Sequence, residues 1–241
     1  MEKVPQGMTE FEKYSEICGL SSHQCEQLVE YGKYIFLRNQ EFNLTGYKTQ
    51  HEIYQNLIID SLTISEINII PFKGRNLIDV GSGAGIPGIV IKILYPSMEV
   101  CFLEASKKKA DFIQSVIRLF NLHGTRVVHA RSETLAHQEG CRESFFLCCT
   151  RALAPMRTAL ELTIPFLRVG GTAIYIKGPR YQEECEEARN AFQILGCSIK
   201  QVKKASVPGI QRENIFVIVK KYLPTPQIYP RKAGIPQKRP L

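Results

Sequence analysis

Three glycines at alternate positions follow a short apolar run, and an acid closes the next predicted strand. The run covers residues 77–80, the glycines are Gly81, Gly83 and Gly85, and the acid is Glu104. Glycine has no Cβ, so the backbone can turn sharply here and approach a ligand closely. A carboxylate about 20 residues after such a loop can accept hydrogen bonds from both hydroxyls of a ribose. The spacing therefore predicts a site for an adenosine-containing cofactor at the carboxyl edge of a parallel sheet.

The loop fits two classes of cofactor. Gly81, Gly83 and Gly85 match the G-x-G-x-G loop of methyltransferases that use S-adenosylmethionine (SAM), whereas Gly83, Gly85 and Gly88 match the G-x-G-x-x-G of dinucleotide-binding proteins. The predicted strand runs directly into Gly81, which favours the methyltransferase register. Pro87 would occupy the first helical turn in the other register, but proline is tolerated at a helix start, so a dinucleotide stays open. A glycine turn that serves packing alone is the third interpretation.

The chain has 241 residues, eight cysteines and a formal net charge of +8. This length suits one α/β domain of about 180 residues with a small appendage. No two cysteines have the C-x-x-C spacing of zinc sites, so no metal site is expected. The first residues do not resemble a signal peptide, and no apolar run approaches the roughly 18 residues of a membrane span. We expect a reduced, soluble, cytoplasmic protein that does not enter a membrane and is monomeric.

Positive charge is concentrated near the C-terminus. No acidic residue follows Glu213, whereas six basic residues do. A basic arm of this kind can neutralise phosphates and fold on binding, which suits an RNA partner; the alternative is a solvated tail that aids solubility. The proline-rich end, from Pro224 to Pro240, is expected to be irregular. The six basic residues are Lys220, Lys221, Arg231, Lys232, Lys238 and Arg239.

The first part of the chain has a helical pattern, and the rest alternates between strands and helices. Residues 9–66 contain no strand signal and are interrupted by a polar turn at 39–46, so residues 1–70 are expected to form an N-terminal helical cap. Alternation from residue 76 predicts a Rossmann-like α/β domain over residues 71–222, with a seven-stranded, mostly parallel sheet. Residues 223–241 are the basic, proline-rich arm.

The last two predicted strands are joined by a short loop around Pro208-Gly209 without a helix. This favours an antiparallel hairpin at the sheet edge. The predicted strands cover residues 76–80, 99–104, 126–129, 145–150, 172–177, 197–203 and 215–220, and the predicted helices cover 86–94, 106–121, 156–168 and 181–195.

Ligands bind beyond the carboxyl ends of the strands in such sheets, so residues at strand ends are the candidates. Ser132 and Glu133 follow the third strand, where an adenine would lie; the alternative for Ser132 is a helix cap. Arg151 ends the fourth strand, at the end that faces the methyl group. It can hold a carboxylate or a phosphate, or donate to guanine O6, and the alternative is an ordinary surface arginine.

The end of the fourth strand lacks the residues of two methyltransferase chemistries. Enzymes that methylate exocyclic amines have an Asn/Asp-Pro-Pro-aromatic segment there, and this chain has Thr150-Arg151-Ala152. Cys148-Cys149 lies in an apolar run and is interpreted as strand core, not as the nucleophile of a cytosine-C5 enzyme. Methylation of a ring nitrogen such as guanine N7 needs neither that segment nor a cysteine nucleophile, because this nitrogen exposes a lone pair. In-line transfer then requires positioning and exclusion of water, so no catalytic side chain is assigned.

These residues together resemble the bacterial small-subunit rRNA guanine-N7 methyltransferase family, RsmG, also called glucose-inhibited division protein B. The resemblance covers nearly the whole chain and implies a class I methyltransferase fold, SAM as donor, and methylation of one guanine in a 16S rRNA loop of the small ribosomal subunit. The family's SAM contacts fall on Gly81, Ile86, Ser132, Glu133 and Arg151. The matching segments are residues 43–45, 60–61, 78–88, 131–133, 151–152, 177–178 and 229–234.

One position departs from the family pattern. Leu57 stands where the family usually has a histidine, three residues before the Asp60-Ser61 pair. If that histidine orders the cap over the cofactor, another group must do so here. Lys177 is a candidate for holding the guanine.

Two other functions stay open. The first is an RNA-binding, ribosome-associated factor with the same fold that has lost catalysis, and the intact glycine loop and Glu104 argue against it. The second is a SAM methyltransferase with a small-molecule or protein substrate, against which the basic C-terminus argues.

Overall fold

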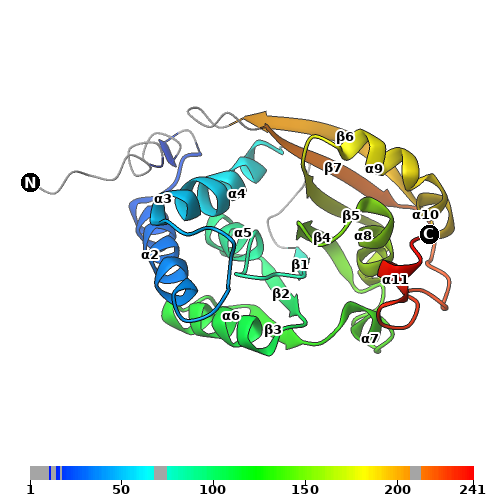
Figure 1. Ribbon diagram of the computed structural model, residues 1–241, viewed down its shortest axis with the longest axis horizontal. Coiled ribbons are helices and arrows are strands. Elements are labelled where there is room, and N and C mark those ends of the chain that lie inside the picture. The colour runs from blue at the N-terminus through cyan, green and yellow to red at the C-terminus, as the bar shows by residue number, and fades with distance from the viewer. Residues whose placement is uncertain (1–10, 12–14, 17, 68–74, 207–212) are drawn as a thin grey trace, which may run out of the picture.

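Seven strands form one sheet in the computed structural model of the chain (Figure 1), which describes residues 11, 15–16, 18–67, 75–206 and 213–241. The strand order is β3-β2-β1-β4-β5-β7-β6. The first five strands pair in parallel, and β7 pairs antiparallel with both β5 and β6. This confirms the predicted fold class. The strands are β1 Asn76–Val80, β2 Glu99–Glu104, β3 Thr125–His129, β4 Phe145–Arg151, β5 Leu167–Lys177, β6 Cys197–Ser206 and β7 Glu213–Lys221.

The order of the parallel strands reverses beside β1. From β1 the chain proceeds outward to β2 and β3, then crosses back so that β4 pairs with the other side of β1. A reversal of this kind opens a crevice beyond the carboxyl ends of the two central strands, where α/β sheets bind ligands. The predicted candidates Gly81 and Arg151 lie at the ends of these two strands.

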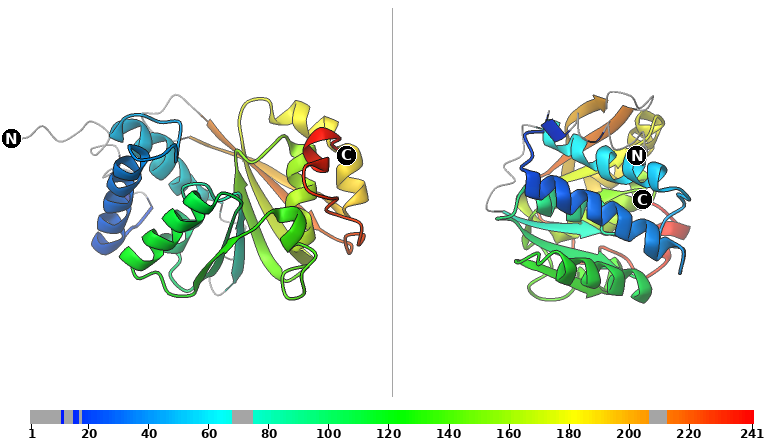
Figure 2. Two further views of the ribbon diagram at one scale, coloured as in Figure 1. Left: turned by 60° about the horizontal axis from the view of Figure 1, so that its bottom comes forward. Right: turned by 90° about the vertical axis from the view of Figure 1, so that its left-hand side faces the viewer.

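Helices cover both faces of the sheet, and each face has its own apolar core (Figure 2). The N-terminal helices pack with α5 and α6 on one face, and α8 and α10 pack on the other. The helices on the first face are α2 Ser22–Asn39, α5 Gly88–Leu94 and α6 Lys107–Leu119; the later helices are α7 Ser132–Leu135, α8 Met156–Thr163, α9 Tyr181–Glu187 and α10 Arg189–Ile194.

The described N-terminal residues before β1 are helical or irregular, and they contain no strand. A capping box starts α2, because the Ser21 hydroxyl accepts from Gln24 N and the Gln24 side chain accepts from Ser21 N. Leu28, Tyr31 and Ile35 are fully buried on one face of this helix. After the turn come α3 Gln50–Ile53, the π-helical η1 Tyr54–Ile59, α4 Asp60–Leu62 and the 3-10 turn η2 Thr63–Glu66.

Some expectations fall on residues outside the described ranges. They are the helical pattern at residues 9–10, 12–14 and 17, the cap boundary at residue 70, and the loop at Pro208-Gly209. The division of the chain into a cap, a methyltransferase domain and an arm stays a prediction.

Most predicted boundaries differ from the structure by three residues or fewer, and three elements differ by more. The expected helix at 156–168 ends at Thr163 and continues as a 3-10 turn, η3 Ile164–Phe166, which contains Pro165. Proline cannot donate the backbone hydrogen bond that would extend the α-helix. β5 then begins at Leu167 rather than at residue 172, and the expected helix at 181–195 is divided at Ala188.

The C-terminal segment packs against the rest of the chain and contains a helical turn, so the expectation that residues 224–240 are irregular is wrong in part. It ends in a short helix, α11 Ile235–Lys238, which lies beside α8 (Figure 1). The Thr158 hydroxyl donates to Pro236 O at 3.0 Å. The Arg142 guanidinium donates to the carbonyls of Thr225, Pro226 and Tyr229. These bonds use side chains far away in the sequence, which a local pattern does not reveal.

No helix in the part of the chain that the structure describes has the length and apolar character needed to cross a membrane. Cys148 and Cys149 are both fully buried in β4, which agrees with their interpretation as strand core.

Candidate functional site

The glycine loop turns directly after β1 and leaves open space in front of Gly83. Gly81 and Gly83 both have left-handed backbone conformations, with φ of +71° and +58°. The loop is attached to the end of β2, because Gly81 N donates to Leu103 O at 2.8 Å. A Cβ built on Gly83 would have only Gly81 O nearby, at 3.9 Å. The backbone at this position is therefore exposed to any ligand in the crevice.

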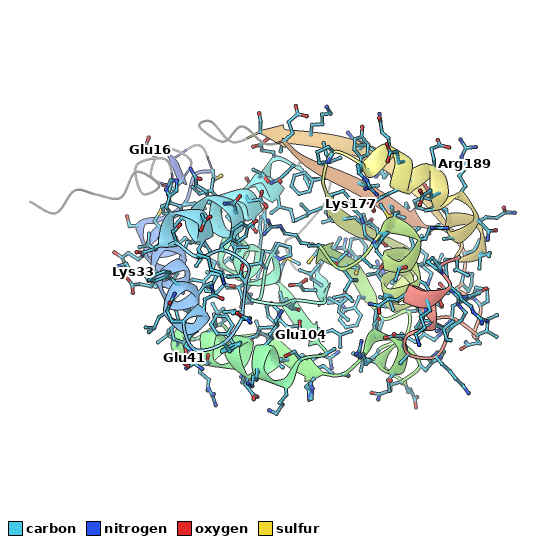
Figure 3. The ribbon with its side chains drawn as sticks, viewed as in Figure 1. Glu16, Lys33, Glu41, Glu104, Lys177 and Arg189 are labelled. Carbon is cyan, nitrogen blue, oxygen red and sulfur yellow. The ribbon has the colours of Figure 1, made fainter. Side chains whose placement is uncertain are left out.

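The carboxylate of Glu104 lies against this loop, at the end of β2 (Figure 3). Its Oε2 accepts from Gly83 N at 2.8 Å, and its Oε1 accepts from Ser106 N at 2.8 Å. Only 8% of the residue is exposed. Two backbone amides thus hold the acid beside the loop, where the sequence spacing predicts a ribose ligand.

The side chain of Asp79 holds the backbone where the glycine loop leads into α5. It is fully buried, and its Oδ2 accepts from Gly88 N at 3.0 Å. Burial raises the pKa of this carboxyl to about 7, because the charged form is disfavoured away from water, although the bond from Gly88 acts in the opposite direction. A Cβ on Gly88 would lie 2.7 Å from Asp79 Oδ2 and 2.5 Å from the Phe102 ring. Close packing therefore accounts for this glycine.

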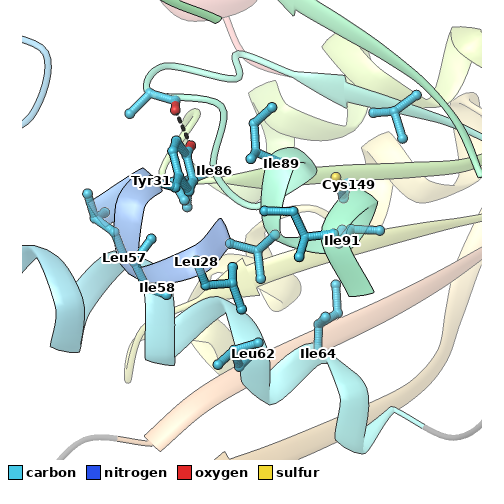
Figure 4. Close-up of a cluster of buried hydrophobic side chains, with 14 of the residues drawn as sticks. Leu28, Tyr31, Leu57, Ile58, Leu62, Ile64, Ile86, Ile89, Ile91 and Cys149 are labelled. Carbon is cyan, nitrogen blue, oxygen red and sulfur yellow. Dashed lines mark hydrogen bonds between the residues drawn. The ribbon is translucent and has the colours of Figure 1, made fainter. Parts of the chain in front are cut away.

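The N-terminal cap also contacts the glycine loop (Figure 4). The hydroxyl of the buried Tyr31 donates to Ala84 O. Burial raises the pKa of Tyr31 well above its usual value, so its proton stays in place for this bond. Helix α2 is thereby joined to the segment that starts α5.

Asn39 shapes the turn that follows α2. Its Oδ1 accepts from Leu44 N at 3.0 Å and from Thr45 N at 2.8 Å, and its Nδ2 donates to Tyr47 O at 2.7 Å. One side chain thus folds the turn so that Leu44, Thr45 and Tyr47 face the crevice. Leu44 and Thr45 belong to a segment that carries the family resemblance, whereas the position of Tyr47 was not predicted.

Arg151 joins the end of β4 to the cap. Its guanidinium donates to Asn56 O at 2.6 Å and forms an ion pair with Asp60 Oδ2 at 3.1 Å. The Asp60 side chain is 4% exposed and that of Arg151 is 15% exposed. Leu57 lies between these two partners in the sequence. The ion pair therefore attaches the cap to β4 beside Leu57.

Two pockets adjoin at the carboxyl ends of the central strands. A smaller pocket of about 220 Å³ lies between the glycine loop and the cap, and a larger one of about 500 Å³ lies beyond β4 and β5. Both are lined by Tyr47, Arg151 and Ala152. The smaller pocket is also lined by Leu44, Thr45, Leu57, Gly81, Ser82, Gly83, Ala84 and Ile86, and the larger by Ala154, Pro155, Ile176, Lys177, Gly178, Glu184, Glu213 and Asn214.

Four predicted cofactor residues line the smaller pocket, namely Gly81, Gly83, Ile86 and Arg151. Glu104 is not in this lining, but its carboxylate accepts a hydrogen bond from Gly83 N. Ser132 and Glu133 are not part of its lining. The Ser132 hydroxyl donates to Leu162 O, so it is already engaged. Glu133 Oε1 accepts from Gly234 N at 3.1 Å, which connects this predicted residue to the C-terminal segment. The role of all seven residues in binding stays a prediction.

Lys177 braces the loop after β4. Its ammonium donates to Ala154 O at 2.8 Å and to Glu184 Oε2 at 2.7 Å, and the side chain is 10% exposed. In the same loop Ala152 has φ of +52°, a conformation that L-residues rarely adopt. The lysine therefore holds a strained loop at the junction of the pockets with two of its three donors, and it also lines the larger pocket, so its role in holding a guanine stays a prediction.

The chain is similar to known proteins over most of its length. Residues 24–215 match the model of the family described as rRNA small subunit methyltransferase G. Over 222 residues the chain is 38% identical to ribosomal RNA small subunit methyltransferase G of Moorella thermoacetica, with 92% of each chain covered. It is 36% identical to the protein of the same name from Desulfitobacterium hafniense, with 92% of this chain and 91% of that one covered.

The fold is also similar to solved structures. The crystal structure of M. jannaschii TYW2 in complex with AdoMet superposes with a TM-score of 0.53, at 13% identity, over 68% of this chain and 74% of that chain. At this identity the similarity concerns the fold alone.

Proposed function

We propose that this chain, which belongs to the rRNA small subunit methyltransferase G family, transfers a methyl group from SAM to N7 of one guanine in 16S rRNA. Residues 24–215 carry the family match. We further propose that it works as a monomer in the cytoplasm, on the small ribosomal subunit.

The glycine loop and its neighbours suit SAM as the donor. The open space at Gly83 gives the methionyl part of the cofactor room beside the backbone, and the adjacent pocket of about 220 Å³ extends it. Glu104 is within hydrogen-bonding distance of the same loop and can turn its carboxylate to ribose hydroxyls. SAM supplies a methyl group on a positively charged sulfur.

The observation that carries the proposal is the junction of the two pockets. Tyr47, Arg151 and Ala152 line both, so a donor in the smaller pocket and an acceptor in the larger one would meet at these residues. The larger pocket has room for a flipped-out base, and Tyr47 offers an aromatic face at its edge.

The side chains around this junction suit a reaction without a general base. Guanine N7 presents a lone pair, so the chain has to orient the base and exclude water. The two thiols of β4, Cys148 and Cys149, are fully buried, and burial raises their pKa well above the usual value. A thiolate nucleophile of the kind used in cytosine methylation is therefore absent from β4, in agreement with direct transfer.

The test is methyl transfer from labelled SAM to 30S subunits from a strain that lacks the enzyme, followed by N7-specific strand cleavage. We expect one cleaved guanine, in 16S rRNA. Label on another base or on a protein would overturn the assigned acceptor. Tight SAM binding without any label, on 30S subunits and on protein-free 16S rRNA alike, would favour the RNA-binding factor without catalysis.

A further inference from the structure

A cluster of basic side chains surrounds Phe146 at the edge of the sheet opposite the candidate site. The Arg75 guanidinium lies 4.2 Å from the centre of the Phe146 ring, and that of Arg168 lies 4.6 Å from it. The Lys220 ammonium is 5.9 Å from the same centre. Three cations thus share one aromatic ring, an arrangement that orients them. The Lys220 ammonium also donates to Gly170 O, which leaves two of its three donors for a ligand.

Two irregularities of the sheet contribute to this cluster. The register of β4 against β5 shifts between Phe145 and Leu147, at Phe146. The register of β6 against β7 shifts between Ile199 and Gln201, at Lys200. A bulge redirects side chains and is frequent beside functional sites. Both irregularities therefore fall on residues of one surface.

The positive charge of this surface is not balanced. Among the residues that the structure describes, no carboxylate forms an ion pair with Arg75, Arg168, Lys200 or Lys220. Burial lowers the pKa of the Lys220 ammonium, and the charges of Lys200 and Arg168 lower it further. Repulsion of this kind destabilises the free protein and would be relieved by a bound polyanion.

We propose that Arg75, Arg168, Lys200 and Lys220 form a second contact surface for RNA phosphates. The planar guanidinium groups of Arg75 and Arg168 suit phosphate oxygens, which accept two parallel hydrogen bonds from such a group. An acidic protein surface could also neutralise these four cations. We assign the surface to RNA because the proposed methyl acceptor is RNA, and in this respect the inference rests on the proposed function.

The position of the surface relative to the candidate site determines how far an RNA must extend to contact both. Arg75 precedes β1 and Gly81 follows it, so the length of this five-residue strand separates the two sites. At a rise of about 3.3 Å per residue, the six steps from Arg75 to Gly81 span roughly 20 Å. An RNA that contacts both edges must pass around the sheet from one edge to the other, so it must extend beyond the methylated loop. A hairpin limited to the target loop would contact the candidate site alone.

The test is the affinity of the Arg75→Gln/Arg168→Gln variant for 30S subunits, for protein-free 16S rRNA and for a short hairpin with the target loop. We expect roughly tenfold weaker binding to both large RNAs at about 0.1 M salt, and a salt dependence reduced by about one unit of slope per arginine. Affinity for SAM and for the hairpin should not change.

Two further variants make the result specific. Arg180→Gln/Arg189→Gln removes the same charge from exposed arginines that pair with Glu183 and Glu186, and it should bind like the parent chain. Arg75→Lys/Arg168→Lys keeps the charge, so it should keep the salt dependence. Equal losses in the Gln and Lys variants would show that the arginines only support the fold of this edge, and would overturn the proposal.

The remaining outcomes are also decisive. Unchanged affinity of the Arg75→Gln/Arg168→Gln variant for both large RNAs would overturn the proposal. A loss seen with 30S subunits but not with protein-free 16S rRNA would identify a ribosomal protein as the partner and overturn the assignment to RNA. Binding is measured without methyl transfer, so a chain that binds through this surface but labels no guanine contradicts only the proposed function.

Discussion

Arg231 binds the buried carboxylate of Glu161 through three hydrogen bonds. Its backbone N donates to Oε1 at 2.8 Å, its Nε donates to Oε1 at 2.9 Å, and its terminal nitrogen donates to Oε2 at 2.6 Å. The Glu161 side chain has no exposed surface, whereas that of Arg231 is 26% exposed. The C-terminal segment thus supplies the charge that balances an acid inside α8.

The first prediction concerns this pair. Arg231→Gln should destabilise the folded chain by about 3–5 kcal/mol, because it leaves a buried carboxylate without its partner. Urea unfolding measures the loss. Glu161→Gln/Arg231→Gln should recover part of it, and Lys232→Gln, at the exposed neighbouring residue, should change little. Equal stability of the Arg231→Gln variant and the parent chain would contradict the inferred role.

The second prediction concerns the space beside the glycine loop. Gly83→Ala should weaken SAM binding by at least tenfold, and Gly83→Asp should abolish it, because a side chain would fill space that the cofactor needs. Gly140→Ala is the matched control, since Gly140 has φ of +77° and open space around it but lies in another loop. Calorimetric titration with SAM compares the affinities of the Gly83 and Gly140 variants. Backbone strain is common to both glycines, whereas only Gly83 adjoins the smaller pocket.

The third prediction separates the two roles of Arg151. Arg151→Gln should lower both the stability and the SAM affinity, because the buried Asp60 loses its ion pair with Arg151. Asp60→Asn/Arg151→Gln should regain stability but not SAM affinity. If the double variant binds SAM as the parent chain does, Arg151 serves only to hold the cap.

The fourth prediction is a pH dependence of stability. The pKa of Asp79 is about 7 in the folded chain, against an ordinary value of 3.8, so the folded chain binds this proton more tightly. The resulting stabilisation is complete below about pH 4 and is lost as the pH rises through about 7. Asp79→Asn keeps an oxygen acceptor for Gly88 N and should remove this slope.

The measurement is the difference in unfolding free energy between the parent chain and the Asp79→Asn variant. Between about pH 5 and about pH 7 it should change by roughly 2–3 kcal/mol, at about 1.4 kcal/mol per pH unit. Asp111→Asn, at a 60% exposed side chain, should follow the parent chain. Parallel pH profiles for the parent chain and Asp79→Asn would rule out the raised pKa.

The fifth prediction concerns Tyr47 at the junction of the pockets. Tyr47→Ala should lower kcat/KM for 30S subunits by about 10–100-fold, the usual loss when a base loses an aromatic stacking partner. Tyr47→Phe keeps the ring and should stay close to the parent chain. Tyr222→Ala, at an exposed tyrosine elsewhere, serves as the control. Equal activity of the Ala and Phe variants would exclude stacking.

The sequence predicted those parts of the site that depend on neighbours along the chain. A strand that ends at Val80 and a strand that ends at Glu104 must bring Gly83 and Glu104 to the same edge once they pair in parallel. The pairing follows from strand–helix alternation, and the acid then lies within reach of the loop. The closeness of Glu104 to the glycine loop could therefore be predicted from the sequence.

Contacts between distant segments could not be predicted in this way. The pairing of Arg151 with Asp60 depends on how the cap is placed over β4, and no periodicity encodes that placement. The binding of Arg231 to Glu161 is similar, because the segment that carries Arg231 has proline and glycine but no helical or strand pattern to identify a packed face. The bonds from Lys177 to Ala154 and Glu184 could not be predicted for the same reason.

The shared use of Arg151 has a thermodynamic consequence. One guanidinium attaches the cap to β4 and also lines the smaller pocket, so a ligand that draws on its donors changes how firmly the cap is held. Linkage is reciprocal: whatever fixes the position of the cap alters the affinity for that ligand by the same factor. An RNA that fixes the position of the cap would therefore change the affinity for the small donor, in addition to any contact that the two make at the junction of the pockets.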